Sequence, residues 1–144
     1  MQDFPHNYLV SARAETTSNV TLSSAGVQDL ESAPPAEFGG PGDQWSPESL
    51  LVAAVIDCFV LSFRAIARAS KLEWVSLDCS ANGVLDRVDR KTQFTGFSIT
   101  AELVVPSGTD EAKAQRLLQK AEDACLITNS LIADSHLEAT VRVL

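Results

Sequence analysis

The stretch "SPESLLVAAVIDCFVLSF", residues 46–63, constrains the fold more than any other part of the chain. It contains the longest apolar run, residues 50–63, which is interrupted by Asp57 and Ser62. This run is shorter than the roughly 18 to 20 residues that cross a bilayer. We therefore expect a helix buried in a protein core and not a membrane span.

The residues before this run are typical of a helix start. Ser46 is a preferred N-cap residue, Pro47 suits the first helical position, and the charge of Glu48 favours the positive end of the helix. The helix should continue to about Ser70. Its first half is apolar on nearly all sides, so we expect protein to surround it.

Short strands with polar breaks precede the helix. The segments "NYLVSARAE", "NVTLSS" and "GVQDLES" each suit a strand, and together they predict a small antiparallel sheet. The next segment, "APPAEFGGPGDQW", is rich in Pro and Gly, so we expect a surface loop that holds neither helix nor strand. Loops of this kind often border functional sites.

Two longer strands, a second helix and a last strand follow. "EWVSLDCSANGVLDRV" and "TQFTGFSITAELVVP" alternate with period two and predict antiparallel strands linked near "DRVDRK". A helix should start around Thr109 to Glu111, and "HLEATVRVL" should close the chain as a strand. We expect one strand face to hold Phe97, Ile99, Ala101, Leu103 and Val105, and the helix stripe to hold Ala114, Leu117, Leu118, Ala121 and Cys125.

The order of these elements, βββ-α-ββ-α-β, indicates the α+β class. A chain of 144 residues commonly folds as one unit, so we expect a single domain over residues 1–144. The net charge of -8 repels phosphate backbones and argues against nucleic-acid binding. The start "MQDFPHNYLV" lacks a secretory signal, so we expect a cytoplasmic protein with no membrane partner.

No pattern predicts a metal or a cofactor. His6 and His136 have no partners at ligand spacing, and no Cys-x-x-Cys occurs. No Gly-rich phosphate loop follows a strand, and no Gly-x-Ser-x-Gly elbow is present. We therefore expect neither a bound metal nor a cofactor.

Three cysteines are candidates for chemistry, because a reducing cytosol keeps structural disulfides open. Cys79 shares a strand face with Leu77 and Ala81 and is interpreted as a small core residue. Cys58 and Cys125 each lie on an apolar helix face, where periodicity alone favours core packing. Two helices on one sheet could nevertheless bring their sulfurs within disulfide reach.

Several segments of the chain resemble one known family. "SPESLLVAAVIDCF" is similar to the segment of the OsmC/Ohr family (osmotically inducible protein C and organic hydroperoxide resistance protein) that leads to the reactive cysteine. "AEDACLITNS" resembles the second cysteine segment of that family, and "GVQDLESAPPAEFGGPGDQWSPESLL" resembles the strand and Gly-rich loop before the central helix. The likeness covers nearly the whole chain. It implies an OsmC-like fold with a buried central helix and an intertwined homodimer.

The resemblance implies a thiol peroxidase that reduces organic or fatty-acid hydroperoxides. Cys58 would match the peroxidatic cysteine that becomes a sulfenic acid, and Cys125 the resolving cysteine that forms a disulfide with it. An external dithiol, such as a lipoyl-bearing protein, would reopen the disulfide. Glu48 would match the glutamate that holds an arginine at the family's site.

The chain departs from the family pattern at two positions. Thr17 aligns with the catalytic arginine, and Leu126 replaces the proline that usually follows the resolving cysteine. Thr cannot grip a thiolate or a peroxide as Arg does. Arg13 would lie about 13 Å along a strand from the position of that arginine. Arg64 is on a different side of the helix from the reactive cysteine.

Glu48 also raises a geometric question. It precedes Cys58 by ten residues, about 15 Å on a straight helix, so the two side chains cannot meet there. Either the helix breaks between them, or Glu48 serves the cysteine of another chain.

Two further hypotheses accompany the peroxidase. The first is a non-catalytic protein of the same fold that binds a small apolar ligand or senses oxidants, which the missing arginine supports. The second is a structural subunit with inert thiols. Phe38, Trp45 and Phe59 could form an apolar mouth for a hydrocarbon peroxide, or they could serve ordinary packing.

Overall fold

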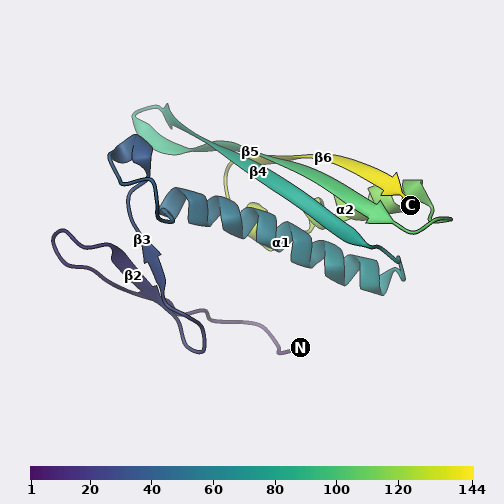
Figure 1. Ribbon diagram of the computed structural model, residues 1–144, viewed down its shortest axis with the longest axis horizontal. Coiled ribbons are helices and arrows are strands. Elements are labelled where there is room, and N and C mark those ends of the chain that lie inside the picture. Colours follow the sequence, from purple (N-terminus) through teal and green to yellow (C-terminus); the bar gives the residue numbers. More distant parts are fainter. The chain divides into compact units, whose positions relative to one another are not determined.

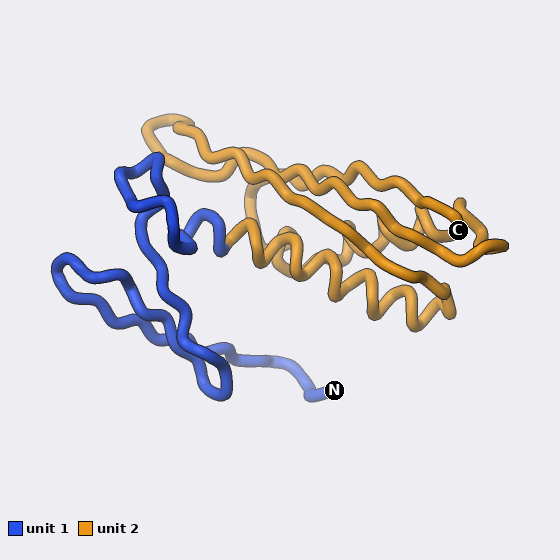
Figure 2. The backbone as a smooth tube through the Cα atoms, viewed as in Figure 1, with its two compact units in different colours: residues 1–50 blue, residues 51–144 orange.

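The computed structural model describes residues 1–144, which form two compact units, residues 1–50 and residues 51–144 (Figure 2). The boundary between them lies within helix α1 (Pro47–Ala69). Each unit has its own three-stranded sheet. The single domain over residues 1–144 stays a prediction.

The first unit contains the predicted small antiparallel sheet. Strands β1 (Ser11–Arg13), β2 (Val20–Ser23) and β3 (Leu30–Ser32) pair in the order β1-β2-β3. Both pairings are antiparallel, with Ala12 opposite Leu22 and Leu22 opposite Leu30. The sequence pattern therefore locates all three strands, although each is shorter than the segment that predicted it.

The Pro- and Gly-rich segment after β3 has more regular structure than predicted. Residues Ala36–Phe38 form a 3-10 helix, η1, and an isolated bridge joins Ser32 to Trp45, so the expectation of neither helix nor strand is wrong at these places. A Cβ added at Gly40 would lie 1.7 Å from the Pro34 carbonyl oxygen, which is closer than two non-bonded atoms can approach. Glycine therefore permits the close backbone approach that folds this loop.

The predicted start of α1 is confirmed. The Ser46 hydroxyl accepts a hydrogen bond from the Ser49 N–H at 3.1 Å, and the Ser49 hydroxyl accepts one from the Ser46 N–H at 2.9 Å. This reciprocal pair is a capping box in which Ser replaces the usual Glu or Gln. Pro47 is the first helical residue, where a missing N–H costs no helical hydrogen bond.

The second unit is built on a sheet of β4 (Ser76–Val88), β5 (Lys91–Val105) and β6 (Asp134–Val143), in that order. β4 and β5 are antiparallel, as predicted. β6 pairs parallel to β5, so the chain crosses over between them (Figure 1). Helices α2 (Glu111–Asp123) and α3 (Leu126–Asn129) form this crossover.

The core of this unit lies on one face of the sheet. Between residues 97 and 103 of β5, buried and exposed residues alternate, which confirms the predicted period of two. Stripes of α1 and α2 complete the same apolar cluster. Its buried members include Val55, Phe59, Phe63 and Ala67 of α1, Phe97, Ile99, Ala101, Leu103 and Val105 of β5, and Ala114, Leu117, Leu118 and Ala121 of α2.

Only one stripe of α1 is covered within the chain. Its buried residues recur at every fourth position, whereas Leu61 on another side is 50% exposed. In the first half of α1, Val55 is buried and most other residues keep part of their surface exposed, so the expectation that protein surrounds this half is wrong for a single chain. At 23 residues, α1 is long and apolar enough to cross a membrane by length and composition, a test that core helices also pass. Its buried stripe is typical of a helix that packs on a core.

The second cysteine lies beyond the helix that was expected to carry it. α2 ends at Asp123, and Cys125 has an extended backbone (φ −64°, ψ 108°) at the N-cap of α3. The expectation that Cys125 lies on the helix face is wrong, although its side chain is buried, at 1% exposed. The Asn129 amide donates to the Asp123 carbonyl at 3.3 Å and so satisfies a carbonyl that the end of α2 leaves free.

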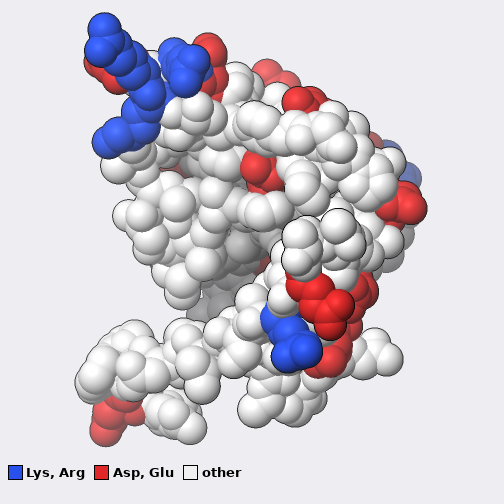
Figure 3. All heavy atoms as spheres, turned by 90° about the vertical axis from the view of Figure 1, so that its left-hand side faces the viewer, with Lys and Arg blue, Asp and Glu red and all other residues white.

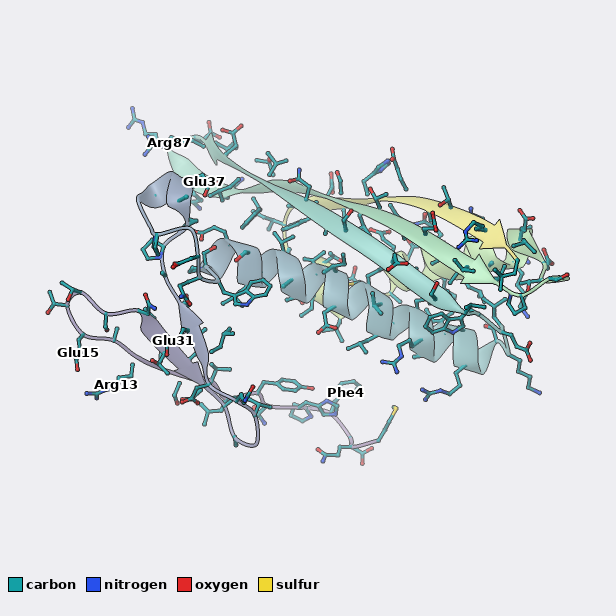
Figure 4. All side chains as sticks on the ribbon, viewed as in Figure 1. Phe4, Arg13, Glu15, Glu31, Glu37 and Arg87 are labelled. Atoms are coloured by element: carbon teal, nitrogen blue, oxygen red, sulfur yellow. The ribbon has the colours of Figure 1, made fainter.

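Charged side chains of both signs occupy the surface. On the face drawn in Figure 3, basic side chains gather at the upper left with acidic ones beside them, and a further basic side chain lies among acidic ones lower on the face. The exposed end of the β4–β5 hairpin, residues 86–91, carries three basic and two acidic side chains at the turn and on the adjoining strand ends. Among them is Arg87, which extends into solvent (Figure 4). The charges of this turn largely offset one another.

Phe63→Ala should lower the free energy of unfolding by about 3 to 5 kcal/mol, the usual cost of deleting a buried Phe side chain. Phe63 has no exposed surface, and its ring meets that of Trp74 edge to face at a centroid distance of 5.5 Å. Urea unfolding followed by circular dichroism measures the change. The control, Val88→Ala at a partly exposed strand end, should cost less than about 1 kcal/mol. Equal costs for the two substitutions would contradict this assignment of the core.

Candidate functional site

The structure brings Cys58 and Cys125 together. Cys58 lies in the middle of α1 and is partly buried, and Cys125 lies between α2 and α3. Both thiols are free, and each is close enough to shift the pKa of the other. The Cys125 thiol also lies 3.9 Å from the Val55 carbonyl oxygen of α1, to which it can donate. The segment between α2 and α3 therefore packs directly on the central helix.

Several neutral donors surround the Cys58 sulfur. The backbone N–H groups of Ile127 and Leu126 hydrogen-bond to it, and the Ser62 hydroxyl lies 3.9 Å away. The first N–H groups of a helix have no partner inside the helix, so those at the start of α3 are free to bond to sulfur. When Cys58 is ionised, the Cys125 thiol can donate its one proton to that sulfur in place of the Val55 carbonyl oxygen.

These contacts shift the pKa of Cys58 downward. Partial burial is the largest single effect and opposes ionisation, but the hydrogen bonds from Ile127, Cys125, Ser62 and Leu126 together outweigh it and lower the pKa. No charged group is among the causes, so donors rather than a cation favour the thiolate. Since the thiolate is the reactive form of cysteine, Cys58 has the environment of a nucleophile.

Cys125 is shifted in the opposite direction. Burial raises its pKa, and hydrogen bonds at Thr128 reduce that effect without reversing it. The hydrogen bond to Cys58 and the negative charge on that sulfur raise the pKa further. The pair therefore combines a thiol whose pKa is lowered with a thiol whose pKa is raised.

Cys79 has a different environment. It lies on β4 at the edge of the core, beside Ile56 and Val60, in a shallow pocket of about 410 Å³. Burial, and then the charge of Asp78, raise its pKa to about 11. At neutral pH Cys79 is almost entirely protonated, which agrees with its interpretation as a small core residue.

Glu48 does not approach Cys58 along the helix. α1 is continuous from Pro47 to Ala69, so the first of the two options, a helix break, is wrong. The Oε2 atom of Glu48 is buried and has no hydrogen-bond partner. Arg13 does not supply one, because it is 84% exposed and lies 3.9 Å from Glu15 (Figure 4).

The remaining predicted residues differ in their exposure. Phe38 and Trp45 keep much of their surface exposed, whereas Phe59 has none and belongs to the core. Phe59 therefore serves packing and does not line an apolar mouth. The exposed apolar side chain at the site is that of Leu126, at 66%. No group of three or more His, Cys, Asp or Glu residues is arranged to hold a metal ion.

Sequence reasoning did not identify the donors to Cys58. Ser62 stood out only as an interruption of the apolar run, yet it follows Cys58 by one helical turn and so shares its face. Leu126 stood out only as a departure from proline. Unlike proline, leucine has a backbone N–H, and this difference could have indicated a hydrogen-bond donor near Cys58.

Cys58 should react with iodoacetamide at lower pH than the other two cysteines. Its pKa lies below the ordinary thiol value, whereas burial raises the pKa of Cys125 and brings that of Cys79 to about 11. Labelling between neutral and alkaline pH, resolved by peptide mass spectrometry, measures the three profiles. In urea the differences should vanish, because they arise from the fold. A Cys58 profile no lower than that of Cys79 would contradict the assignment.

Leu126→Pro should slow labelling of Cys58 at neutral pH by about three- to tenfold, since loss of one donor to a thiolate shifts its pKa by up to about one unit. Proline lacks the N–H that Leu126 provides and is tolerated at the first position of a helix. Leu126→Ala is the matched control, because it shortens the side chain but keeps the N–H. Equal labelling rates for the Pro and Ala variants would show that this N–H does not stabilise the thiolate.

Residues 40–140 match the family model described as OsmC-like protein. Among curated proteins, an organic hydroperoxide resistance protein of Xanthomonas axonopodis pv. citri is 31% identical over 134 residues, which cover 88% of this chain and 89% of that protein. The peroxiredoxin OsmC of Escherichia coli is 29% identical over 93 residues, 65% of this chain and 64% of that protein.

Solved structures show the same fold. An OsmC-like protein of unknown function from Vibrio cholerae has a TM-score of 0.81 at 21% identity and covers 96% of this chain and 100% of that one. An organic hydroperoxide resistance protein from Legionella pneumophila has a TM-score of 0.76 at 22% identity, with 97% and 99% covered. The predicted α+β, OsmC-like fold is confirmed.

Proposed function

Because this chain belongs to the OsmC/Ohr family, we propose that it is a thiol-dependent peroxidase that reduces organic hydroperoxides, with Cys58 as nucleophile and Cys125 as resolving cysteine. The observation that carries the proposal is the proximity of a thiol whose pKa is lowered to a second thiol whose pKa is raised. Relatives named organic hydroperoxide resistance protein and peroxiredoxin OsmC support a role of the family in peroxide resistance.

In the first step the Cys58 thiolate attacks the distal oxygen of the hydroperoxide. An S–O bond forms as the O–O bond breaks, and the sulfur gives up two electrons. The leaving alkoxide takes a proton from solvent and departs as an alcohol. Cys58 is then a sulfenic acid, a reversible state of cysteine oxidation. The donors at Ser62, Leu126 and Ile127 would favour this step by lowering the pKa of Cys58.

In the second step Cys125 condenses with the sulfenic acid. Its sulfur attacks the Cys58 sulfur, and the hydroxyl leaves with the Cys125 proton as water. The proximity of the two thiols, each of which shifts the pKa of the other, supports this step. An external dithiol, such as a lipoyl-bearing protein, then reduces the disulfide by thiol exchange and is itself oxidised to a disulfide.

We further propose that the protein is a cytoplasmic homodimer without nucleic-acid or membrane partners. A second copy would cover the apolar side of α1 that the chain leaves exposed around Leu61. Glu48 gives independent support, because its buried Oε2 has no partner and the unbroken helix keeps it from its own Cys58. In the dimer, Glu48 would serve the site of the other copy.

One observation favours the alternative of a non-catalytic protein that binds a small apolar ligand or senses oxidants. Thr17 stands at the position of the family arginine, and no cation contributes to the pKa of Cys58. A protein of this kind could form the Cys58–Cys125 disulfide once but would not sustain peroxide turnover. Multiple-turnover kinetics therefore separate the two functions.

Reduced protein should consume cumene hydroperoxide over many turnovers when a dithiol is supplied. Cys58→Ser should abolish consumption, because the hydroxyl is not a nucleophile at neutral pH, and Cys79→Ser should leave it unchanged. Cys125→Ser should retain the first step and stop at the sulfenic acid. Intact mass after one equivalent of peroxide should show loss of two hydrogens in the unaltered protein and gain of one oxygen in Cys125→Ser. Undiminished consumption in Cys58→Ser would refute the mechanism.

A further inference from the structure

We propose that Ser62 is a further catalytic residue, whose hydroxyl donates a hydrogen bond to the Cys58 sulfur when Cys58 is the attacking thiolate. The catalytic role of Ser62 rests on the proposed peroxidase function. The hydrogen bond itself can be tested without any peroxide. Ser62 would thereby supply one of the interactions that the family pattern assigns to an arginine.

The geometry of α1 brings the two side chains together. Ser62 follows Cys58 by four residues, and residues at this spacing lie on the same face of a helix, one turn apart. The Oγ and Sγ atoms are 3.9 Å apart, within the longer range of hydrogen bonds to sulfur. Both residues are partly buried, so water competes with this contact less than it would on an open surface. The Ser62 hydroxyl makes no other side-chain hydrogen bond.

The chemistry fixes the direction of the bond in the reactive state. A thiol could donate to the Ser62 oxygen or accept from it, but a thiolate has no proton and can only accept. The hydroxyl proton of Ser62 must therefore point to sulfur when Cys58 is ionised. Hydrogen bonds to a charged acceptor are stronger than those between neutral groups, so the contact favours the thiolate over the thiol.

The surroundings of Cys58 make this donor important. The titratable group that faces Cys58 from the segment between α2 and α3 is Cys125, which keeps its own proton. On α1 the neighbouring Asp57 is exposed. No cation from any packed element contributes, and the other donors at α3 belong to the backbone. Substitution of Ser62 removes a hydroxyl donor without changing the backbone. It therefore tests whether neutral donors stabilise the Cys58 thiolate.

The position also argues against a role in packing. Ser62 interrupts a run that is otherwise apolar, and Ser is a weaker helix former than Ala in a helix interior. An alanine would suit both the helix and the apolar surroundings. The hydroxyl is thus unfavourable for local structure and useful at the Cys58 sulfur.

The experiment compares Ser62→Ala with Ser62→Thr in the full chain. Ser62→Ala removes the hydroxyl and should shift the pH profile of Cys58 alkylation upward, slowing labelling at neutral pH by about three- to tenfold. Ser62→Thr keeps a hydroxyl and should stay within about twofold of the unaltered protein. Ser98→Ala, on the exposed face of β5, is the matched control and should have no effect. Circular dichroism confirms that each variant is folded.

A second measurement links the hydrogen bond to catalysis. The rate at which cumene hydroperoxide oxidises Cys58 in a single turnover should fall in Ser62→Ala by the same factor as labelling at the same pH. An unchanged alkylation profile in Ser62→Ala, or a Ser62→Thr profile that matches it, would overturn the inference. Failure of the unaltered protein to consume peroxide would instead refute the proposed function. The labelling shift would then still establish Ser62 as a donor to the thiolate.

Discussion

A single stripe of buried side chains holds α1 against the sheet, and the position of the Cys58 sulfur depends on it. Cys58 follows Val55 by three residues and precedes Phe59 by one, so it lies beside the stripe rather than at its centre. A residue at the centre would be sealed in the core, where a thiol stays protonated. At the edge, the sulfur is only partly buried, so it can accept hydrogen bonds from neighbouring groups and still keep part of its surface exposed.

The segment that joins α2 to α3 supplies what this edge position lacks. Burial alone would raise the pKa of Cys58, and hydrogen bonds to a thiolate favour the charged form. Two backbone N–H groups of α3, together with Ser62 and the Cys125 thiol, outweigh the burial. The same segment carries Cys125, so the hydrogen bonds that lower the pKa of Cys58 come from the segment that also places the second sulfur nearby.

The sequence was sufficient to predict the order of the elements and much of the core. Period-two alternation located the buried face of β5, and Ser46 with Pro47 located the start of α1, because these signals act within one element. The end of α2 before Cys125 could not be predicted in this way, since the apolar spacing of the helix continues past its last residue. The donors to Cys58 were also missed, because they depend on how distant segments pack. The exposure of Leu61 was missed for a similar reason. An apolar sequence indicates that a side chain favours burial, but not whether the same chain covers it.

The two departures from the family pattern are related through one physical requirement. A thiolate needs either a positive charge or enough hydrogen-bond donors nearby, and Thr17 cannot provide the charge. A proline at position 126 would have no N–H to offer, whereas Leu126 has one and directs it to the Cys58 sulfur. Replacing arginine removes a stabilising interaction, and replacing proline adds one at the same atom. The two departures therefore have opposite effects on the stability of the Cys58 thiolate. Together they are consistent with a thiolate that neutral groups stabilise.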